Sequence, residues 1–447
     1  RRGALFQEFM ERTQGQVDGA LVKRLFQANA EWIDWLVGRY QLAEEYELLQ
    51  DSGMFGPGFL RQKVHCIWND RRIDGMIGPG GGGWFITSKM QKILQEKGAR
   101  ILCGTAAQRL ICREDGQVTG VLAQDAGGPV EIRCAAVVIA AGAFTRNKAI
   151  MDKMQPLFYD DEGKEPVHIF TCSTCTGDGI SMCEAIGADI DYVHRRVNMF
   201  GPMRHPYPGV TLNIGNGPMF RTDGVRYEKG FDNQEVSDLA FVPHRFVWKI
   251  TNEANARAAI EAKIAQGLDL HGIDLGHFLR HWKAVLTEEA EDHSVVIADT
   301  LEELAEKLGF DPERFVSDIA QYHRSLSETP PVPPAPSPDG PGDGEMDLSF
   351  LMGPPPRPME AGPYYSIKMK LFHENSVGGM VIDENTRVLR DGAPIPGLYA
   401  AGDNTRGIML PGNIGVRYIE RVFSALTVAF NTGYIAGVEA AAFAQGV

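Results

Sequence analysis

A glycine-rich loop in the first quarter of the chain has the residue types and spacing of a nucleotide-binding turn. Residues 78–84 read GPGGGGW, which fits the G-x-G-x-x-G pattern that binds a dinucleotide pyrophosphate. This chemistry needs a strand before the loop, a helix after it and an acidic residue at the end of the following strand. A helix can follow, but residues 65–77 make a poor strand, and the next expected strand ends in Cys103-Gly104-Thr105 without an acid. The loop is therefore either a pyrophosphate loop or a flexible connection before a helix.

Cysteines and histidines offer weaker patterns for redox or metal chemistry. Cys172 and Cys175 form a C-x-x-C with Cys183 nearby, which would suit redox chemistry or cluster ligation, but no second pair accompanies it. His277 and His281 are four residues apart on an expected helix, a spacing that could bind a metal. A solvated helix face explains the same spacing more simply. We therefore predict no metal site.

The composition is that of an ordinary globular protein with net negative charge. Its 447 residues favour two domains, and 44% of them are hydrophobic and 23% charged. The formal net charge of −14 argues against nucleic acid or an anionic membrane as a partner, because like charges repel. No apolar run approaches the roughly 18 residues that span a bilayer. The seven cysteines, an odd number, favour free thiols in a reducing compartment over a disulfide framework.

The apolar patterns predict an α/β arrangement at both ends of the chain. The run that ends residues 131–144, EIRCAAVVIAAGAF, is typical of a buried parallel strand, and Gly142 would let the chain turn beneath a ligand. The other expected elements are helices at 15–40, 84–97, 176–190 and 419–446, a strand at Ala99–Cys103 and a hairpin around Asp115-Gly116.

The middle of the chain has a different character. Its periodicity is weak between about 196 and 360, apart from helical stretches near 251–267 and 300–327. The segment at 330–344, PPVPPAPSPDGPGDG, is typical of a surface insertion or linker. We therefore predict a first domain in two parts, 1–195 and 363–447, with a second domain at 196–362 inserted between them.

Three segments together resemble a known flavoprotein family. They are residues 118–144, the helix start TGDGISMCEAIGADI at 176–190, and residues 378–407, which contain GLYAAGD and are followed by GYIAG at 433–437. In this order they resemble the soluble fumarate reductases, succinate dehydrogenase flavoprotein subunits and 3-ketosteroid dehydrogenases over nearly the whole chain. The resemblance implies an α/β fold, in which a Rossmann-like FAD-binding domain carries an inserted α+β capping domain. FAD would be bound non-covalently.

The resemblance also changes the interpretation of the glycine-rich loop. In the family, the pyrophosphate fingerprint belongs to an earlier βαβ unit, which is not found in this sequence. The FAD-binding domain is therefore expected to be incomplete at its N-terminus, and localisation, cytoplasmic or exported, stays open because any signal would lie upstream. On this alignment Gly81, Gly82, Gly83 and Trp84 belong to a loop beside the flavin and the substrate.

Cofactor-binding residues follow from the same resemblance. Asp178 of TGDG would lie close to FAD, and Ala106 and Ala107 match the backbone that binds adenine. Asp403 matches a carboxylate that accepts from the ribityl hydroxyls. Backbone N–H groups at the start of the last helix would face the flavin pyrimidine and stabilise negative charge on the reduced ring. The remaining predicted contacts are Ala141, Gly142, Asn375, Gly402, Ser424, Ala425 and Leu426.

The predicted chemistry is hydride transfer between flavin N5 and a carbon beside an activating carbonyl, with a proton added or removed on the other side. This sequence departs from the fumarate reductase pattern, because Gln234 falls where the family has its proton-donor Arg. Glu374 falls where the family has a substrate His, with His373 one residue early. Arg417 is the best candidate for a substrate-facing cation. Without the cationic clamps that a dicarboxylate needs, a larger and less charged unsaturated substrate is expected.

Tyrosines could also supply acid–base chemistry, as they do in the steroid dehydrogenases of the family. The candidates are Tyr207, Tyr227 and Tyr418, although a packed tyrosine with no catalytic role would explain each more simply. The predicted function is an FAD-dependent reductase of an activated carbon–carbon double bond, fed by an external electron donor. One alternative is a ketosteroid-type dehydrogenase that runs in reverse. Another is a non-catalytic subunit that has lost FAD binding.

Overall fold

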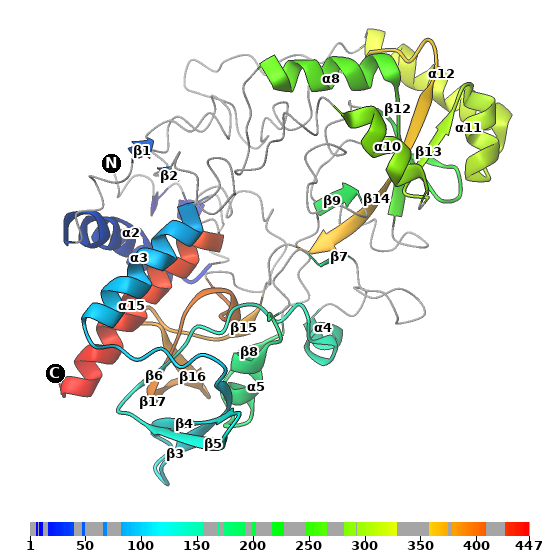
Figure 1. Cartoon of the computed structure of the whole chain (residues 1–447). Coiled ribbons are helices and arrows are strands. Elements are labelled where there is room, and N and C mark those ends of the chain that lie inside the picture. The colour runs from blue at the N-terminus through cyan, green and yellow to red at the C-terminus, as the bar shows by residue number, and fades with distance from the viewer. Residues whose placement is uncertain are drawn as a thin grey trace. The chain divides into compact units, whose positions relative to one another are not determined.

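The computed structural model describes most of the elements that surround the predicted cofactor site (Figure 1). The described residues are 6–7, 9–11, 17–39, 47–49, 66–68, 82–154, 168–169, 174–192, 199–202, 217–227, 246–265, 281–291, 293–328, 357–373, 378–407 and 425–446. Two units are distinguished. Unit 1 contains residues 1–42, 100–199 and 373–447, and unit 2 contains residues 43–99 and 200–372. The functional assignment of the predicted domains stays a prediction.

Unit 1 is built on two three-stranded sheets. The first is an antiparallel sheet of β3 (Ala106–Cys112), β4 (Val118–Asp125) and β5 (Gly128–Arg133), and it confirms the predicted hairpin. The second has the order β16–β17–β6, from β16 (Arg387–Arg390), β17 (Ala393–Ala400) and β6 (Val137–Ile139). β6 and β17 run parallel, which confirms the parallel strand expected from the apolar run.

The strand expected at Ala99–Cys103 is wrong. These residues follow the end of α3 (Gly82–Glu96), where the Ala99 N–H donates to the Leu94 carbonyl at 2.9 Å. Residues 99–104 are exposed, and Gly98 and Gly104 both have a positive φ, so the segment turns twice before β3 begins at Ala106. The helix that was expected after the glycine-rich loop is confirmed as α3.

Four helices of unit 1 are described in this part of the chain: α2 (Gly19–Arg39), α4 (Lys148–Met154), α5 (Asp178–Glu184) and α15 (Ala425–Gln445). The Asp18 carboxylate accepts from the Leu21 N–H at 3.0 Å and caps the first turn of α2. α2 packs against α15, where the rings of Trp32 and Phe430 stack with centroids 4.8 Å apart. A short β15 (Gly379–Met380) pairs with β8 (Ile190–Asp191).

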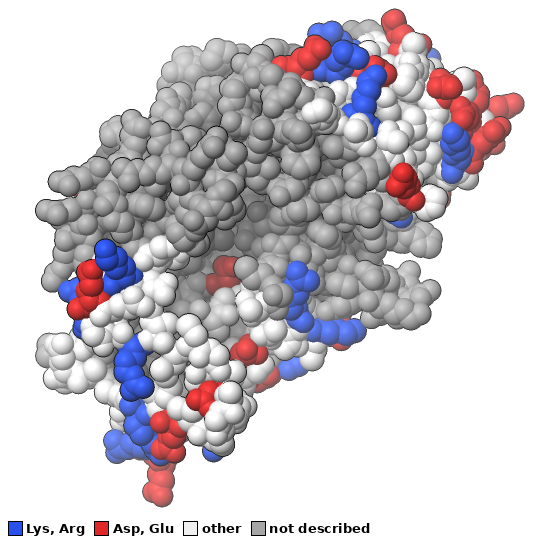
Figure 2. Space-filling view, viewed as in Figure 1, with Lys and Arg blue, Asp and Glu red and all other residues white. Residues whose placement is uncertain are grey.

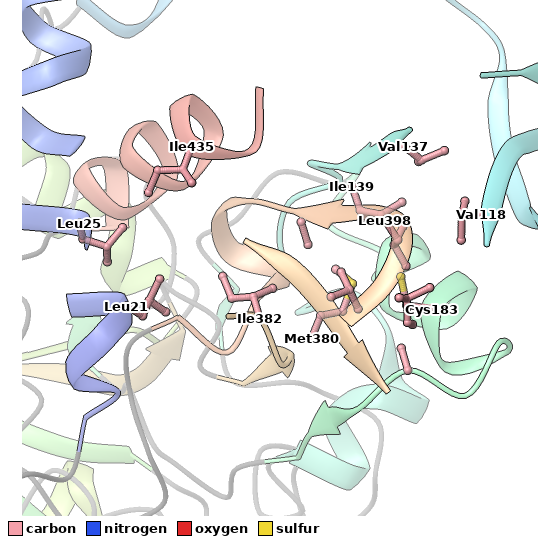
Figure 3. Close-up of a cluster of buried hydrophobic side chains, with 14 of the residues drawn as sticks. Leu21, Leu25, Val118, Val137, Ile139, Cys183, Met380, Ile382, Leu398 and Ile435 are labelled. Carbon is pink, nitrogen blue, oxygen red and sulfur yellow. The ribbon is translucent and has the colours of Figure 1, made fainter. Parts of the chain in front are cut away.

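Apolar side chains from these elements form one buried cluster in unit 1 (Figure 3). α2 supplies Leu21 and Leu25, and α15 supplies Ile435, all three of them 0% exposed. Further members of the cluster, from the sheet strands, α5 and the residue Ile382 after β15, include Val118, Val137, Ile139, Cys183, Met380, Ile382 and Leu398. Ile139 and Leu398 lie on the face of β6 and β17 that this core covers. The core therefore fixes the two parallel strands whose ends form the candidate site.

Unit 2 is built on an antiparallel sheet with the order β11–β10–β12–β14–β13. Its strands are β10 (Met219–Arg221), β11 (Arg226–Tyr227), β12 (Phe246–Asn252), β13 (Val295–Ala298) and β14 (Tyr364–His373), and β9 (Met199–Pro202) also pairs with β14. The helices are α8 (Glu253–Ala265), α10 (Trp282–Glu291), α11 (Leu301–Leu308) and α12 (Pro312–Glu328). β1 (Glu47–Leu49) and β2 (Cys66–Trp68) form a separate two-stranded antiparallel sheet, and β7 (His168–Ile169) pairs with β14.

The single helical stretch expected near 300–327 is two helices. The Thr300 side chain caps α11 by accepting from the Glu303 N–H, and α11 ends at Gly309 with φ 75°. A left-handed residue cannot continue a helix, so α12 begins only at Pro312. Leu304 and Phe315 from these helices are buried against Trp248 of the sheet.

Candidate cofactor site

The candidate site begins where the two parallel strands β6 and β17 end. Parallel strands place their carboxyl ends at the same edge of a sheet, which is where nucleotide cofactors bind in open α/β folds. The Ala401 N–H donates to the Ile139 carbonyl at 2.9 Å, so the two strands stay paired to their last residues. Ala141 and Gly142 continue from β6. Gly402 and Asp403 continue from β17 into a single 3₁₀ turn, η8 (Gly402–Asn404).

Asn404, which is absent from the predicted set of site residues, joins the two strand ends. Its Oδ1 accepts from the Ala141 N–H at 2.9 Å, and its Nδ2 donates to the Ala401 carbonyl at 2.6 Å and to the Ile139 carbonyl at 3.4 Å. The side chain is 0% exposed. The signal in the sequence is weak, since an asparagine after GLYAAGD is also typical of an exposed turn. Of the predicted residues, Ala141, Gly402 and Asp403 are thus brought to one edge of the sheet.

The start of α5 lies against the same edge. Gly177 has φ 72° and its N–H donates to the Ala143 carbonyl at 3.3 Å. A Cβ on Gly179 would lie 2.6 Å from Ile139 Cγ2 and 3.3 Å from Asn404 Oδ1, so only glycine fits this contact. Asp178, between these two glycines, is exposed at the first residue of the helix. The glycines of TGDG therefore allow close packing of helix on strand and leave the Asp178 carboxylate accessible.

The last helix holds the turn after β17. Thr432 of α15 donates its hydroxyl to the Val428 carbonyl at 2.6 Å and accepts from the Gly402 N–H at 3.0 Å. Gly402 has φ 75°, which favours glycine at this position. Ala425 and Leu426 are the first two residues of α15, and Ser424 lies outside the described residues.

Burial sets the electrostatics of this edge. Asp403 is half-buried, and burial raises the pKa of its carboxyl above the ordinary value of 3.8. Hydrogen-bond donors stabilise the charged form of a carboxylate in such a position. The hydroxyls of a ribityl chain are donors of this kind, so the residue type and its burial suit the contact that was predicted for Asp403.

The residues at this edge therefore fit FAD. They offer a desolvated carboxylate at Asp403, a glycine turn at Gly402 with positive φ, and Gly142, whose φ is 73° and around whose missing Cβ no described atom lies within 4 Å. Open backbone of this kind allows a planar ring or a phosphate to approach closely.

Other predicted residues belong to other elements or lie outside the described residues. Ala106 and Ala107 are the first two residues of β3 and are exposed. Gly82, Gly83 and Trp84 form the start of α3, and His373 is the last residue of β14. The residues that lie outside the described ranges are Gly81, Tyr207, Gln234, Glu374, Asn375, Arg417 and Tyr418, together with Cys172 and His277.

The cysteines and histidines that the structure describes do not change this picture. Burial raises the pKa of the Cys183 thiol to about 12, which leaves it a packed core residue with little thiolate at neutral pH. His281 lies in the turn before α10. Within the described ranges, no group of three or more His, Cys, Asp or Glu side chains is arranged to hold a metal ion.

The surface charge is mixed. Figure 2 shows basic and acidic side chains interspersed over the described part of the face in view, without a broad basic patch there. Among the helices that the structure describes, none has both the length and the apolarity needed to cross a bilayer.

Comparison with known proteins identifies the class. Residues 6–415 match the family model described as FAD binding domain, so the chain belongs to this family, and FAD is its cofactor. One relative is the NADH:acrylate oxidoreductase of Vibrio harveyi, 26% identical over 440 residues, which cover 96% of this chain and 37% of that protein. Another is the 4-oxocyclohex-2-ene-1-carboxylate 5-dehydrogenase of Sinomonas cyclohexanicum, 26% identical over 372 residues, which cover 77% of this chain and 58% of that protein.

The fold agrees with this assignment. The open conformation of a flavocytochrome c3 fumarate reductase superposes with a TM-score of 0.62 at 21% identity, covering 99% of this chain and 68% of that chain. The chain thus spans about two-fifths to three-fifths of the length of the two relatives named above. The family resemblance predicted from the TGDG and GLYAAGD segments is confirmed, and so is the FAD cofactor.

Proposed function

We propose that this chain carries the FAD-dependent reduction of an activated carbon–carbon double bond in an α,β-unsaturated carbonyl substrate. The observation that carries the proposal is the match of residues 6–415 to the FAD-binding family, together with a relative named as an acrylate oxidoreductase. Acrylate is the simplest α,β-unsaturated carboxylate, so its double bond is activated in the sense that hydride transfer requires. The electrons would come from a separate donor.

The cofactor would be held by the edge at which β6 and β17 end. Asp403 would accept hydrogen bonds from it, Gly142 and Gly402 would allow its close approach, and Asp178 would lie beside it. When bound there and reduced by the electron donor, the flavin would supply a hydride to the substrate carbon. The first turn of α15, at Ala425 and Leu426, would direct N–H groups at the anionic side of the ring.

Side chains of this chain would complete the reaction by polarising the carbonyl and delivering a proton. Arg417 is proposed as the cation that faces the carbonyl oxygen. Tyr207, Tyr418 and His373 are proposed as proton donors. The departures from the dicarboxylate pattern at Gln234 favour a substrate that is bulkier and less charged than fumarate. The Rossmann-like domain and the capping domain at 196–362 that would close over this substrate belong to the same proposal.

A second candidate is the reverse reaction, desaturation beside a ketone. The observation that favours it is the relative named as a 4-oxocyclohex-2-ene-1-carboxylate 5-dehydrogenase, which is as similar in sequence as the acrylate oxidoreductase. The potential of the bound flavin decides the direction. A third candidate, a non-catalytic subunit, requires that the complete protein holds no flavin.

The test uses protein expressed from the complete gene and reduced chemically without oxygen. Acrylate, cinnamate, fumarate and a steroid enone are added in turn while the flavin absorbance is followed. Reoxidation by an unsaturated acid or enone supports the reductase, and the order of rates reports whether charge or bulk is preferred. Arg417→Gln should lose this reoxidation, whereas Arg314→Gln, on the exposed surface of α12, should keep it.

Two results would count against the reductase. Flavin that is reoxidised by none of the four compounds, but is reduced by a saturated ketone, would favour the dehydrogenase. Protein from the complete gene without any flavin absorbance would favour the non-catalytic subunit.

A further inference from the structure

The side-chain amide of Asn404 makes three hydrogen bonds, all to backbone groups at the ends of two strands that are far apart in the sequence. Oδ1 accepts from Ala141, 263 residues away, and Nδ2 donates to the carbonyls of Ala401 and Ile139. The amide therefore closes the gap between the ends of β6 and β17 at the point where their pairing stops. A neutral amide supplies an acceptor oxygen and a nitrogen with two donor hydrogens, and this bridge uses both atoms.

Close backbone contacts surround the same residue. A Cβ on Gly379 of β15 would lie 2.4 Å from the Asn404 carbonyl oxygen, and a Cβ on Gly179 of α5 would lie 3.3 Å from Oδ1. Two glycines thus allow two further segments to reach Asn404. Four segments therefore lie close to Asn404: the ends of β6 and β17, which its amide bonds, and α5 and β15, which approach it at glycines.

We propose that Asn404 is a positioning residue for FAD. By holding Ala141 to η8, it fixes the spacing between the backbone that follows β6 and the Asp403 carboxylate that follows β17. FAD would contact both the backbone after β6 and the Asp403 carboxylate. The distance between these two groups is fixed only while the Asn404 amide joins the two strand ends. This inference rests on the proposed function of the edge as the FAD site, and adds to it the residue that sets its geometry.

The test compares Asn404→Leu and Asn404→Asp with a matched control at Asn431. Leu has a similar volume and neither donor nor acceptor, and Asp keeps the acceptor and loses the donor. Asn431 on α15 is equally buried, at 0% exposed, and its Nδ2 donates to the Leu25 carbonyl at 3.4 Å. Asn431→Leu removes a buried amide from the same unit at the contact between α15 and α2.

Three quantities are measured on protein from the complete gene: the FAD dissociation constant, the midpoint potential of the bound flavin and the thermal stability of the FAD-free form. Both Asn404 variants should bind FAD about tenfold more weakly or worse and shift the potential, since at least one strong hydrogen bond is lost. Asn431→Leu should lower the stability of the FAD-free form and leave the affinity and the potential unchanged.

The outcomes separate this inference from the proposed function. Asn404 variants that lose stability but keep wild-type FAD affinity and potential would overturn the positioning role, leaving the FAD site standing. An equal loss of affinity in Asn431→Leu would overturn it too, because the effect would then be general destabilisation. Wild-type protein that binds no FAD would overturn the proposed function, and the inference with it.

Discussion

Replacement of Gly179 by alanine tests how closely α5 must approach the candidate cofactor site. The new Cβ would lie 2.6 Å from Ile139 Cγ2 and 3.2 Å from Ala141 Cβ. The first distance is about 1 Å shorter than an ordinary contact between carbon atoms. Ile139 cannot retreat easily, because it is 5% exposed in the core and its carbonyl accepts from Ala401.

The expected loss is the difference of two effects. Overpacking of a filled core costs about 1–3 kcal/mol, and the change from glycine to alanine in a helix returns at most about 1 kcal/mol. The stabilisation gained by replacing glycine with alanine is small here, because Gly179 is in the first turn of α5. We expect a net loss of about 1–2 kcal/mol in the free energy of unfolding. For a unit of this size that lowers the melting temperature by about 2–8 °C.

Gly437→Ala is the matched control. Gly437 lies inside α15, is exposed, and its added Cβ would meet no atom within 4 Å. The same substitution should therefore stabilise the helix by about 0.5–1 kcal/mol and raise the melting temperature. The assay is thermal unfolding of both variants beside the wild type, with the FAD affinity of each measured by titration.

Two results would refute this reasoning. A Gly179→Ala variant that melts at or above the wild-type temperature would mean that α5 can move away from β6 at no cost. A variant that is destabilised but binds FAD as tightly as the wild type would mean that this contact does not control the cofactor edge.

Three further predictions concern a hydroxyl and two titrating groups. Thr432→Val should cost about 1 kcal/mol or more by leaving the half-buried Gly402 N–H of the turn after β17 without its acceptor, measured by thermal unfolding; Thr287→Val, which removes an exposed hydroxyl bonded within its own helix, should cost much less. The FAD-free protein should lose stability as pH rises above 3.8 through the raised pKa of Asp403, because the folded form binds the extra proton, and Asp403→Asn should abolish this slope in a series of melts. Burial lowers the pKa of His323 below 6.5, and its Nε2 accepts from the Met359 N–H at 3.0 Å, so stability should fall as pH falls below 6.5; a His323→Gln variant that keeps the same acid-side slope would contradict this.

Local patterns predicted much of the fold. The hairpin around Asp115-Gly116 forms because a two-residue turn signal lies between alternating runs, and both signals are local. The continuous apolar runs before Gly142 and Gly402 form the paired parallel strands that such runs predict, although Val138 in the middle of β6 is 38% exposed. The glycines that follow mark the turns at the candidate site, which is why its location could be predicted.

Local patterns failed where a neighbouring segment set the outcome. Ala99–Cys103 is apolar enough for a strand, but the helix before it ends in a glycine turn that leaves these residues exposed. The stretch near 300–327 has one continuous helical period, yet Gly309 adopts a left-handed conformation and ends α11. In both places a glycine with positive φ, Gly98 or Gly309, ends the helix despite the apolar residues around it. The backbone conformation at the glycine, not the burial of its neighbours, sets the direction of the chain there.

The sequence alone determined the family, the cofactor and the two strand ends at which the cofactor is proposed to bind. Those features depend on short motifs, in which each residue determines the conformation of residues close to it in the sequence. Tertiary structure decided how the strand ends are joined, through the amide of Asn404 and the close approach of Gly179 to Ile139. A hydrogen bond between residues 263 positions apart leaves no periodicity or motif in the sequence. From the sequence alone, an asparagine that bridges two strands cannot be distinguished from one in an exposed turn.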